Sequence, residues 1–132
     1  MLTNVKERAS NRERLSQSLQ RVVAQLVPQQ LSHVEVQFDL DFWDAKAENL
    51  VPVDIGLWVE AGRTRRLIIV EGWQRNQAIN AMFVRAVAKK CALSQAYRAI
   101  IVARKVPTRA AINVARELGI HILIWKQAHA PA

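Results

Sequence analysis

The second half of the chain alternates strand patterns with helix patterns, and this alternation limits the possible folds more than any other feature. Residues 65–73, 99–103 and 120–125 are apolar runs typical of buried strands. Two segments with apolar residues at helical spacing separate them. Neighbouring strands that are connected through a helix are parallel. The sequence therefore predicts a parallel sheet covered by helices.

Local signals mark the ends of these two helices. Asn76 can cap the first one, whose inward stripe is expected to be Ile79, Met82, Phe83, Ala86 and Val87. The second helix is expected to follow Pro107 and Thr108 and to end at Gly119, which stands where a helix is commonly closed by glycine.

The first half of the chain predicts a helix followed by an antiparallel meander. Apolar residues recur at helical spacing within residues 4–26, and Pro28 ends this pattern. Residues 33–40 alternate as in a half-buried strand, residues 41–50 are polar and loop-like, and residues 51–60 and 65–73 predict a hairpin. The prediction is one α/β domain over residues 1–132, with a mixed central sheet flanked by helices in the order α-β-β-β-α-β-α-β.

Charge is unevenly distributed along this basic chain. The net charge is +8, yet residues 35–60 carry seven acidic side chains and one basic one, whereas residues 61–132 carry thirteen basic and two acidic ones. An acidic centre within a basic surface suits a protein that binds a divalent metal and a polyanion. Arginine outnumbers lysine, which favours phosphate as the bound group and nucleic acid, with DNA first, as the partner. Solubility alone is the alternative explanation.

Five basic residues are the candidate nucleic-acid contacts. Arg63, Arg65 and Arg66 lie at the tip of the predicted hairpin, and Arg85 and Lys89 lie on the helix that follows it. An arginine-rich turn can equally serve to protect the edge of a sheet.

Several classes of protein are excluded. No apolar run approaches the roughly 20 residues that span a bilayer, and the first fifteen residues lack the apolar segment of a secretory signal. A single cysteine, Cys91, forms no internal disulfide, and its spacing from the three histidines does not indicate a zinc site. A cytoplasmic protein is expected.

Two acidic residues interrupt strands that otherwise look buried. Asp54 lies in the run VPVDIG and Glu71 in IIVEGW, and burying a carboxylate without a partner is costly. Adjacent strands can bring both residues to one edge of the sheet, where they would bind Mg²⁺ or Mn²⁺ through oxygen. The alternative is that each is a solvated residue at a strand end or pairs with a neighbouring arginine.

These residues and their order resemble the PD-(D/E)xK nuclease superfamily, which has the restriction-endonuclease-like fold. Pro52, Val53 and Asp54 match the first part of its motif, and Glu71 follows 17 residues later after an apolar strand. The later strand-helix-strand segment matches as well, so the resemblance covers nearly the whole chain. It implies that Asp54 and Glu71 bind a divalent metal and that the substrate is nucleic acid. It also implies that an acidic residue on the first helix, Glu7 or Glu13, can add a ligand.

The chain departs from that pattern at one position. The superfamily has a lysine two residues after the glutamate, and here this residue is Trp73. Gln74 and Arg75 are the expected substitutes, since glutamine can orient water and arginine can bind phosphate. Lys89 and Lys90 are expected to lie too far away, about 20 Å along the following helix.

The leading hypothesis is a nucleic-acid-binding, nuclease-like protein that is a candidate metal-dependent endonuclease. A homodimer is expected because a small single domain engages one strand at a time and because the four tryptophans suit a core or an interface. One alternative is a catalytically inactive binding or regulatory subunit, which Trp73 favours. The other is a protein-interaction module with a basic face.

Overall fold

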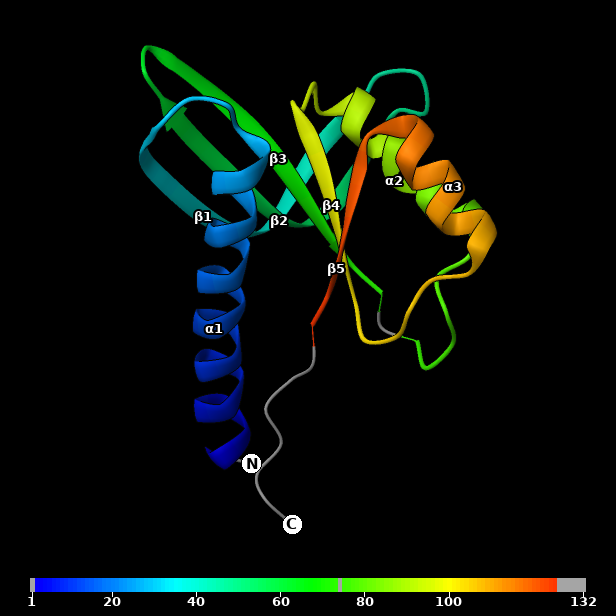
Figure 1. Ribbon diagram of the computed structural model, residues 1–132, viewed down its shortest axis with the longest axis horizontal. Helices are drawn as coiled ribbons and strands as arrows, with labels where there is room; N and C mark the ends of the chain where they lie inside the picture. The colour runs from blue at the N-terminus through cyan, green and yellow to red at the C-terminus, as the bar shows by residue number, and fades with distance from the viewer. Residues whose placement is uncertain (1, 74, 126–132) are drawn as a thin grey trace.

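The computed structural model describes residues 2–73 and 75–125 and shows one five-stranded mixed sheet with three helices (Figure 1). The elements follow the predicted order: α1 (Leu2–Leu26), β1 (Leu31–Asp44), β2 (Asn49–Ala61), β3 (Thr64–Gly72), α2 (Ala81–Leu93), β4 (Arg98–Ala103), α3 (Arg109–Leu118) and β5 (Ile120–Ile124). The strands lie side by side in sequence order. The first three are antiparallel, and β3, β4 and β5 are parallel, as the two helical connections predict.

The helices cover opposite faces of the sheet. Leu19 and Val23 of α1 are fully buried against one face, together with Leu57 and Ile68 of the sheet. The buried side chains of α2 and α3 pack on the other face. The N-terminal half of α1 extends past the ends of β3, β4 and β5 (Figure 1).

The first hairpin is longer than predicted. Residues 41–50 were expected to form a loop, but β1 and β2 remain paired as far as Asp44 and Asn49. The carboxylate of Asp44 accepts hydrogen bonds from the backbone N–H groups of Lys46 and Ala47, which closes a tight turn. The polar residues near the tip are exposed, so the composition of this segment resembles that of a loop although its backbone is paired.

The helix α2 begins later than predicted. Its N-cap is Asn80, whose side chain accepts a hydrogen bond from the N–H of Phe83, and not Asn76. Ile79 is buried before the helix starts, and Met82 is 78% exposed. At α3 the prediction is confirmed, since Thr108 caps the start and Gly119 closes the end with a φ of 69°.

Both strands of the first hairpin change face halfway along. Phe38 and Ile55 pack under α1, whereas Leu40 and Val53 pack under α2 and α3. Asp39 lies between Phe38 and Leu40 in β1 and has a φ of 59°. Aspartate tolerates such a backbone better than most residues, so it suits this sharp twist. Pairing between β2 and β3 stops at Ile55 and Val70, so the two strands separate at the next residue pair, Asp54 and Glu71.

The tryptophans lie outside the fully buried core. Trp43 is 60% exposed, and Trp58, Trp73 and Trp125 are half-buried. Among the helices described, none has the length and apolar character needed to cross a membrane.

Candidate active site

The structure brings Asp54 and Glu71 together where β2 leaves β3. The backbone N–H of Asp54 donates a hydrogen bond to Oε2 of Glu71 at 3.4 Å. The N–H of Gly72 donates to Oδ2 of Asp54 at 2.8 Å. The two carboxylates thus replace the strand-to-strand hydrogen bonds that end at this point, which holds them side by side.

Of the two carboxylate residues, Glu71 is the more buried. Only 4% of it is exposed, whereas Asp54 lies at the surface. Burial raises the pKa of Glu71 above its ordinary value, and the neighbouring Asp54 raises it further, while a hydrogen bond from Lys90 lowers it. A bound cation would favour the charged form of both carboxylates. An additional positive charge next to the two carboxylates would therefore stabilise them in the ionised form.

Lys90 supplies the cation that the sequence analysis did not place. Its Nζ donates to Oε1 of Glu71 at 2.5 Å and to the backbone oxygen of Pro52 at 2.8 Å. The expectation that Lys90 lies too far from Glu71 was therefore wrong. Lys89, the preceding residue, is exposed.

The direction of α2 explains why Lys90 reaches Glu71. The chain leaves the end of β3, passes through a loop before Ala81, and returns along the sheet, so the rise of the helix brings its last turns back toward β2. Val84 and Val87 form the buried stripe of this helix. Lys90 follows Val87 by three residues, so it lies on the same side. The position of Lys90 beside the buried stripe of α2 was the feature of the sequence that could have indicated its contact with the sheet.

Trp73, where the resemblance led us to expect the motif lysine, brings no charge to the pair. Its ring packs on Phe83 with 4.6 Å between ring centroids, and its Nε1 donates to the backbone oxygen of Gln77 at 2.7 Å. The guanidinium of Arg75 lies 5.4 Å from the ring of Trp73. Arg75 is thus directed to the tryptophan, and Gln74 lies outside the described residues.

The first helix brings no acidic side chain to the pair in the part described. Glu13 is exposed on α1, and the side chain of Glu7 lies outside the described part of the structure. Among the side chains that the structure describes, those of residues 10–73 and 75–125, there is no group of three or more histidine, cysteine or acidic residues placed to hold a metal. The candidate site is therefore a pair of carboxylates with one lysine.

The candidate phosphate contacts fall in two places. Arg63 lies in the turn before β3, and Arg65 and Arg66 lie at the start of the strand. Five residues of strand, about 17 Å, separate Arg66 from Glu71. Arg65 forms ion pairs with Glu35 at 3.3 Å and Glu60 at 4.0 Å.

Arg66 stacks on the ring of Tyr97, with its guanidinium carbon 4.2 Å from the ring centroid. Arg85 and Lys89 are exposed on α2, one helical turn apart, on the helix that carries Lys90. The α2 pair is thus on an element of the site, whereas the hairpin arginines lie at the other end of β3.

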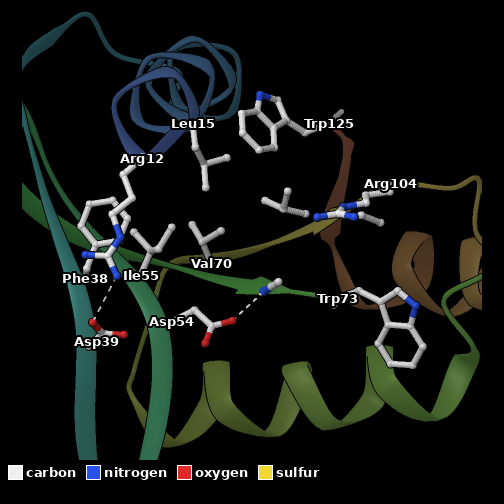
Figure 2. A pocket seen from close by; sticks show the side chains of 13 residues that line it. Arg12, Leu15, Phe38, Asp39, Asp54, Ile55, Val70, Trp73, Arg104 and Trp125 are labelled. Atoms are coloured by element: carbon white, nitrogen blue, oxygen red, sulfur yellow. Dashed lines mark hydrogen bonds and ion pairs between the residues drawn. The ribbon is translucent and has the colours of Figure 1, made fainter. Parts of the chain in front are cut away.

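A cavity of about 250 Å³ opens beside Asp54 (Figure 2). It lies between α1 and the C-terminal ends of β3, β4 and β5, where parallel strands commonly place a ligand. Arg12, Phe38, Arg104 and Trp125 line it, and none of the first three was a candidate functional residue from the sequence. The four residues come from four different elements or their ends, so only the tertiary structure brings them together.

Comparisons with known proteins give a fold and no closer relationship. No protein-family model matches the chain, and no curated protein matches it either. Among solved structures, it is similar to a repair endonuclease from Pyrococcus abyssi, with a TM-score of 0.54 and 15% identity over 91% of this chain and 47% of that one.

It is also similar to the protein of unknown function AF1548, with a TM-score of 0.53 and 11% identity over 67% of this chain and 48% of that one. The chain thus spans about half the length of either protein. The element order, the sheet and these similarities together show that the chain has the restriction-endonuclease-like fold.

Proposed function

We propose that the protein is a divalent-metal-dependent phosphodiesterase that acts on nucleic acid, with DNA as the expected substrate. The observation that carries this proposal is the convergence of Asp54, Glu71 and Lys90 at the point where β2 and β3 separate. The three residues come from two strands and a helix, and they lie on a nuclease-like fold. A lysine from α2 then takes the place that Trp73 leaves without a charge.

The two carboxylates fit Mg²⁺ or Mn²⁺. Magnesium is usually held by one or two carboxylates together with water and substrate phosphate, so a pair of acidic residues is a sufficient protein contribution. A divalent cation held by Asp54 and Glu71 would supply water activation and neutralise the charge of the scissile phosphate. Because Asp54 is at the surface, a phosphate can approach it from solvent.

Lys90 has two functions in this proposal. Its Nζ favours the ionised form of Glu71, which a metal ligand requires, and its hydrogen bond to Pro52 fixes the side chain next to β2. A lysine in this position would also place a positive charge and a hydrogen-bond donor beside the metal pair, where they would orient the attacking water. The side chain is 29% exposed, which leaves a path from Nζ to solvent.

Basic residues outside the site would hold the rest of the polyanion. Arg85 and Lys89 would contact phosphates near α2, and Arg63, Arg65 and Arg66 would contact a part of the strand or duplex about 17 Å away. Cleavage of both strands of a duplex or of a branched junction requires two such sites. We therefore propose a homodimer for those substrates.

Nicking of supercoiled plasmid, together with cleavage of labelled single-stranded and junction DNA, tests this function in Mg²⁺ and then in Mn²⁺. The expected result is metal-dependent cleavage that Asp54→Asn and Glu71→Gln abolish and that Lys90→Met reduces by at least a hundredfold. Lys46→Met, on the exposed turn of the first hairpin, is the matched control and should cleave like the wild type.

Three results would contradict the proposal. Cleavage that survives Asp54→Asn would show contamination or another site. Absence of cleavage with DNA binding that weakens steeply as salt rises would indicate an inactive binding subunit, because phosphate contacts release counterions. Absence of binding at low salt would favour a protein-interaction module.

A further inference from the structure

The cavity beside Asp54 is built from aromatic rings, apolar side chains and guanidinium groups. Its floor is Ile55 and Val70, both buried, and Phe38 and Trp125 stand on opposite sides of it (Figure 2). Asp54 lines the same cavity, so whatever occupies the cavity lies next to the candidate metal site.

Separate contacts fix the ring of Phe38 and the backbone of Trp125. The guanidinium carbon of Arg12 lies 4.6 Å from the centroid of the Phe38 ring, and Arg12 also pairs with Asp39 at 3.7 Å. The backbone N–H of Trp125 donates to the oxygen of Ala103 at 2.7 Å, which fixes the residue at the end of β5.

The charges of the cavity are nearly balanced. Asp39 is paired with Arg12, Arg104 contributes a positive charge on the wall near Trp125, and Asp54 contributes a negative charge on the side of the metal site. An apolar, aromatic cavity with a guanidinium in its wall suits a planar, electron-rich ring. A phosphate in the cavity would meet Asp54 as well as the guanidinium groups, and it would leave the apolar floor and the rings without a partner.

The volume limits the occupant to one ring system. The cavity measures about 250 Å³. This is just below the roughly 300–1,000 Å³ of pockets that enclose a whole drug-sized ligand. It has room for a single nucleobase and not for a base pair.

We infer that this cavity receives one unpaired nucleobase, from the nucleotide next to the phosphate held at Asp54 and Glu71. This inference rests on the proposed function and adds to it a class of substrate: single-stranded or locally unpaired nucleic acid. A base inside a duplex is stacked and paired, and it can enter the cavity only by leaving the helix. Stacking on aromatic side chains repays that cost and is tolerant of base identity.

Single-stranded oligonucleotides with one 2-aminopurine test the inference. The fluorescent base is moved along the strand, and binding is measured with Ca²⁺, which takes the same oxygen ligands as Mg²⁺. The expected result is a change in fluorescence at one or two positions only, where the base enters the cavity. An abasic residue at that position should weaken binding by the wild-type protein about tenfold, since one stacked base is lost.

A variant that fills the cavity provides the matched comparison. Leu15 and Leu26 are both half-buried residues of α1 that pack against the same core cluster, but only Leu15 lines the cavity. Leu15→Trp should remove the fluorescence change and weaken binding of the single strand about tenfold. Leu26→Trp should retain both. The abasic oligonucleotide keeps the inference testable on the wild-type protein even where Leu15→Trp does not fold.

The outcomes separate the inference from the proposed function. Equal affinity for single strand and duplex, with no position-specific fluorescence change, overturns the inference, and the function stands as long as Asp54→Asn still abolishes cleavage. Loss of binding in both Leu15→Trp and Leu26→Trp also overturns the inference, because both substitutions would then act by disturbing α1 and not by filling the cavity. Absence of any nucleic-acid binding or cleavage overturns both.

Discussion

Removal of Lys90 tests the electrostatics of the site without reference to substrate. In Lys90→Met the chain keeps an apolar stem of similar length but loses the cation beside Glu71. The side chain of Glu71 is 6% exposed, so its carboxylate would be left with the N–H of Asp54 as its remaining partner. Breaking a fully buried ion pair costs about 3–5 kcal/mol. Because the side chain of Lys90 is 29% exposed, we expect a loss of about 2 kcal/mol at pH 8.

The loss should depend on pH in a defined direction. The pKa of Glu71 in the folded protein is already raised, mainly by burial, so the fold favours the protonated carboxyl. The contribution of Glu71 to the free energy of unfolding is therefore largest below the ordinary pKa near 4.5, and it falls as pH rises through the folded pKa. Lys90 lowers that folded pKa, so its removal raises it further and enlarges the fall, by at most about 1.4 kcal/mol per pH unit for one proton.

Urea unfolding followed by tryptophan fluorescence at pH 4.5 and at pH 8 measures this difference. Lys90→Met should lose about 2 kcal/mol at pH 8 and less than about 1 kcal/mol at pH 4.5. Lys89→Met is the control, because it removes an exposed lysine one residue away and should change stability by less than about 0.5 kcal/mol at either pH. A loss of equal size at both pH values would refute the argument, since it would mean that Lys90 acts through packing and not through the charge of Glu71.

Three further predictions concern the core, a helix cap and metal binding. Gly56→Ala should destabilise the protein by about 1–3 kcal/mol, because a Cβ there would lie 2.9 Å from Leu40; unchanged urea unfolding would show that Leu40 moves freely. Thr108→Ala should cost about 1 kcal/mol in the same assay, because it removes the hydroxyl that accepts from the N–H of Ala111. Unchanged stability in Thr108→Val, which keeps the shape of the side chain but lacks the hydroxyl, would contradict the role of the hydroxyl. Mn²⁺ at a hundred times its Kd should stabilise the fold by about 2.7 kcal/mol in thermal melts, and Asp54→Asn should remove this gain; an equal gain in the variant would place the metal elsewhere.

The parts of the fold that follow from local pattern were predicted from the sequence. The alternation of strand and helix in residues 65–125 depends on short-range periodicity, and the structure confirms the order and the parallel pairing of β3, β4 and β5. Thr108 and Gly119 are capping signals that act within one helical turn, and both are confirmed. The predicted boundaries of the elements were wrong where the residue composition suggests a loop but the backbone is paired in the sheet. Residues 41–50 look like a loop because they are polar, yet backbone pairing with the opposite strand keeps most of them extended.

The candidate site shows the same division between local and distant information. Asp54 and Glu71 were identified from the sequence because a carboxylate in an apolar strand is costly without a partner, and the structure places them side by side. Their metal and the contacts of Arg63, Arg65, Arg66, Arg85 and Lys89 with nucleic acid stay predictions.

The sequence by itself determined the order of the elements, the acidic pair and the basic balance of the surface, because each of these depends on residue type and short-range spacing. Only the tertiary structure decided which cation faces Glu71 and which rings surround the cavity. Lys90 is 19 residues from Glu71, and Phe38 and Trp125 are nearly 90 residues apart. Lys90 meets Glu71 because α2 turns back along the sheet. Phe38 and Trp125 line one cavity because the middle of β1 and the residue after β5 both lie beside α1. Those contacts are set by the packing of whole elements, which no local spacing records.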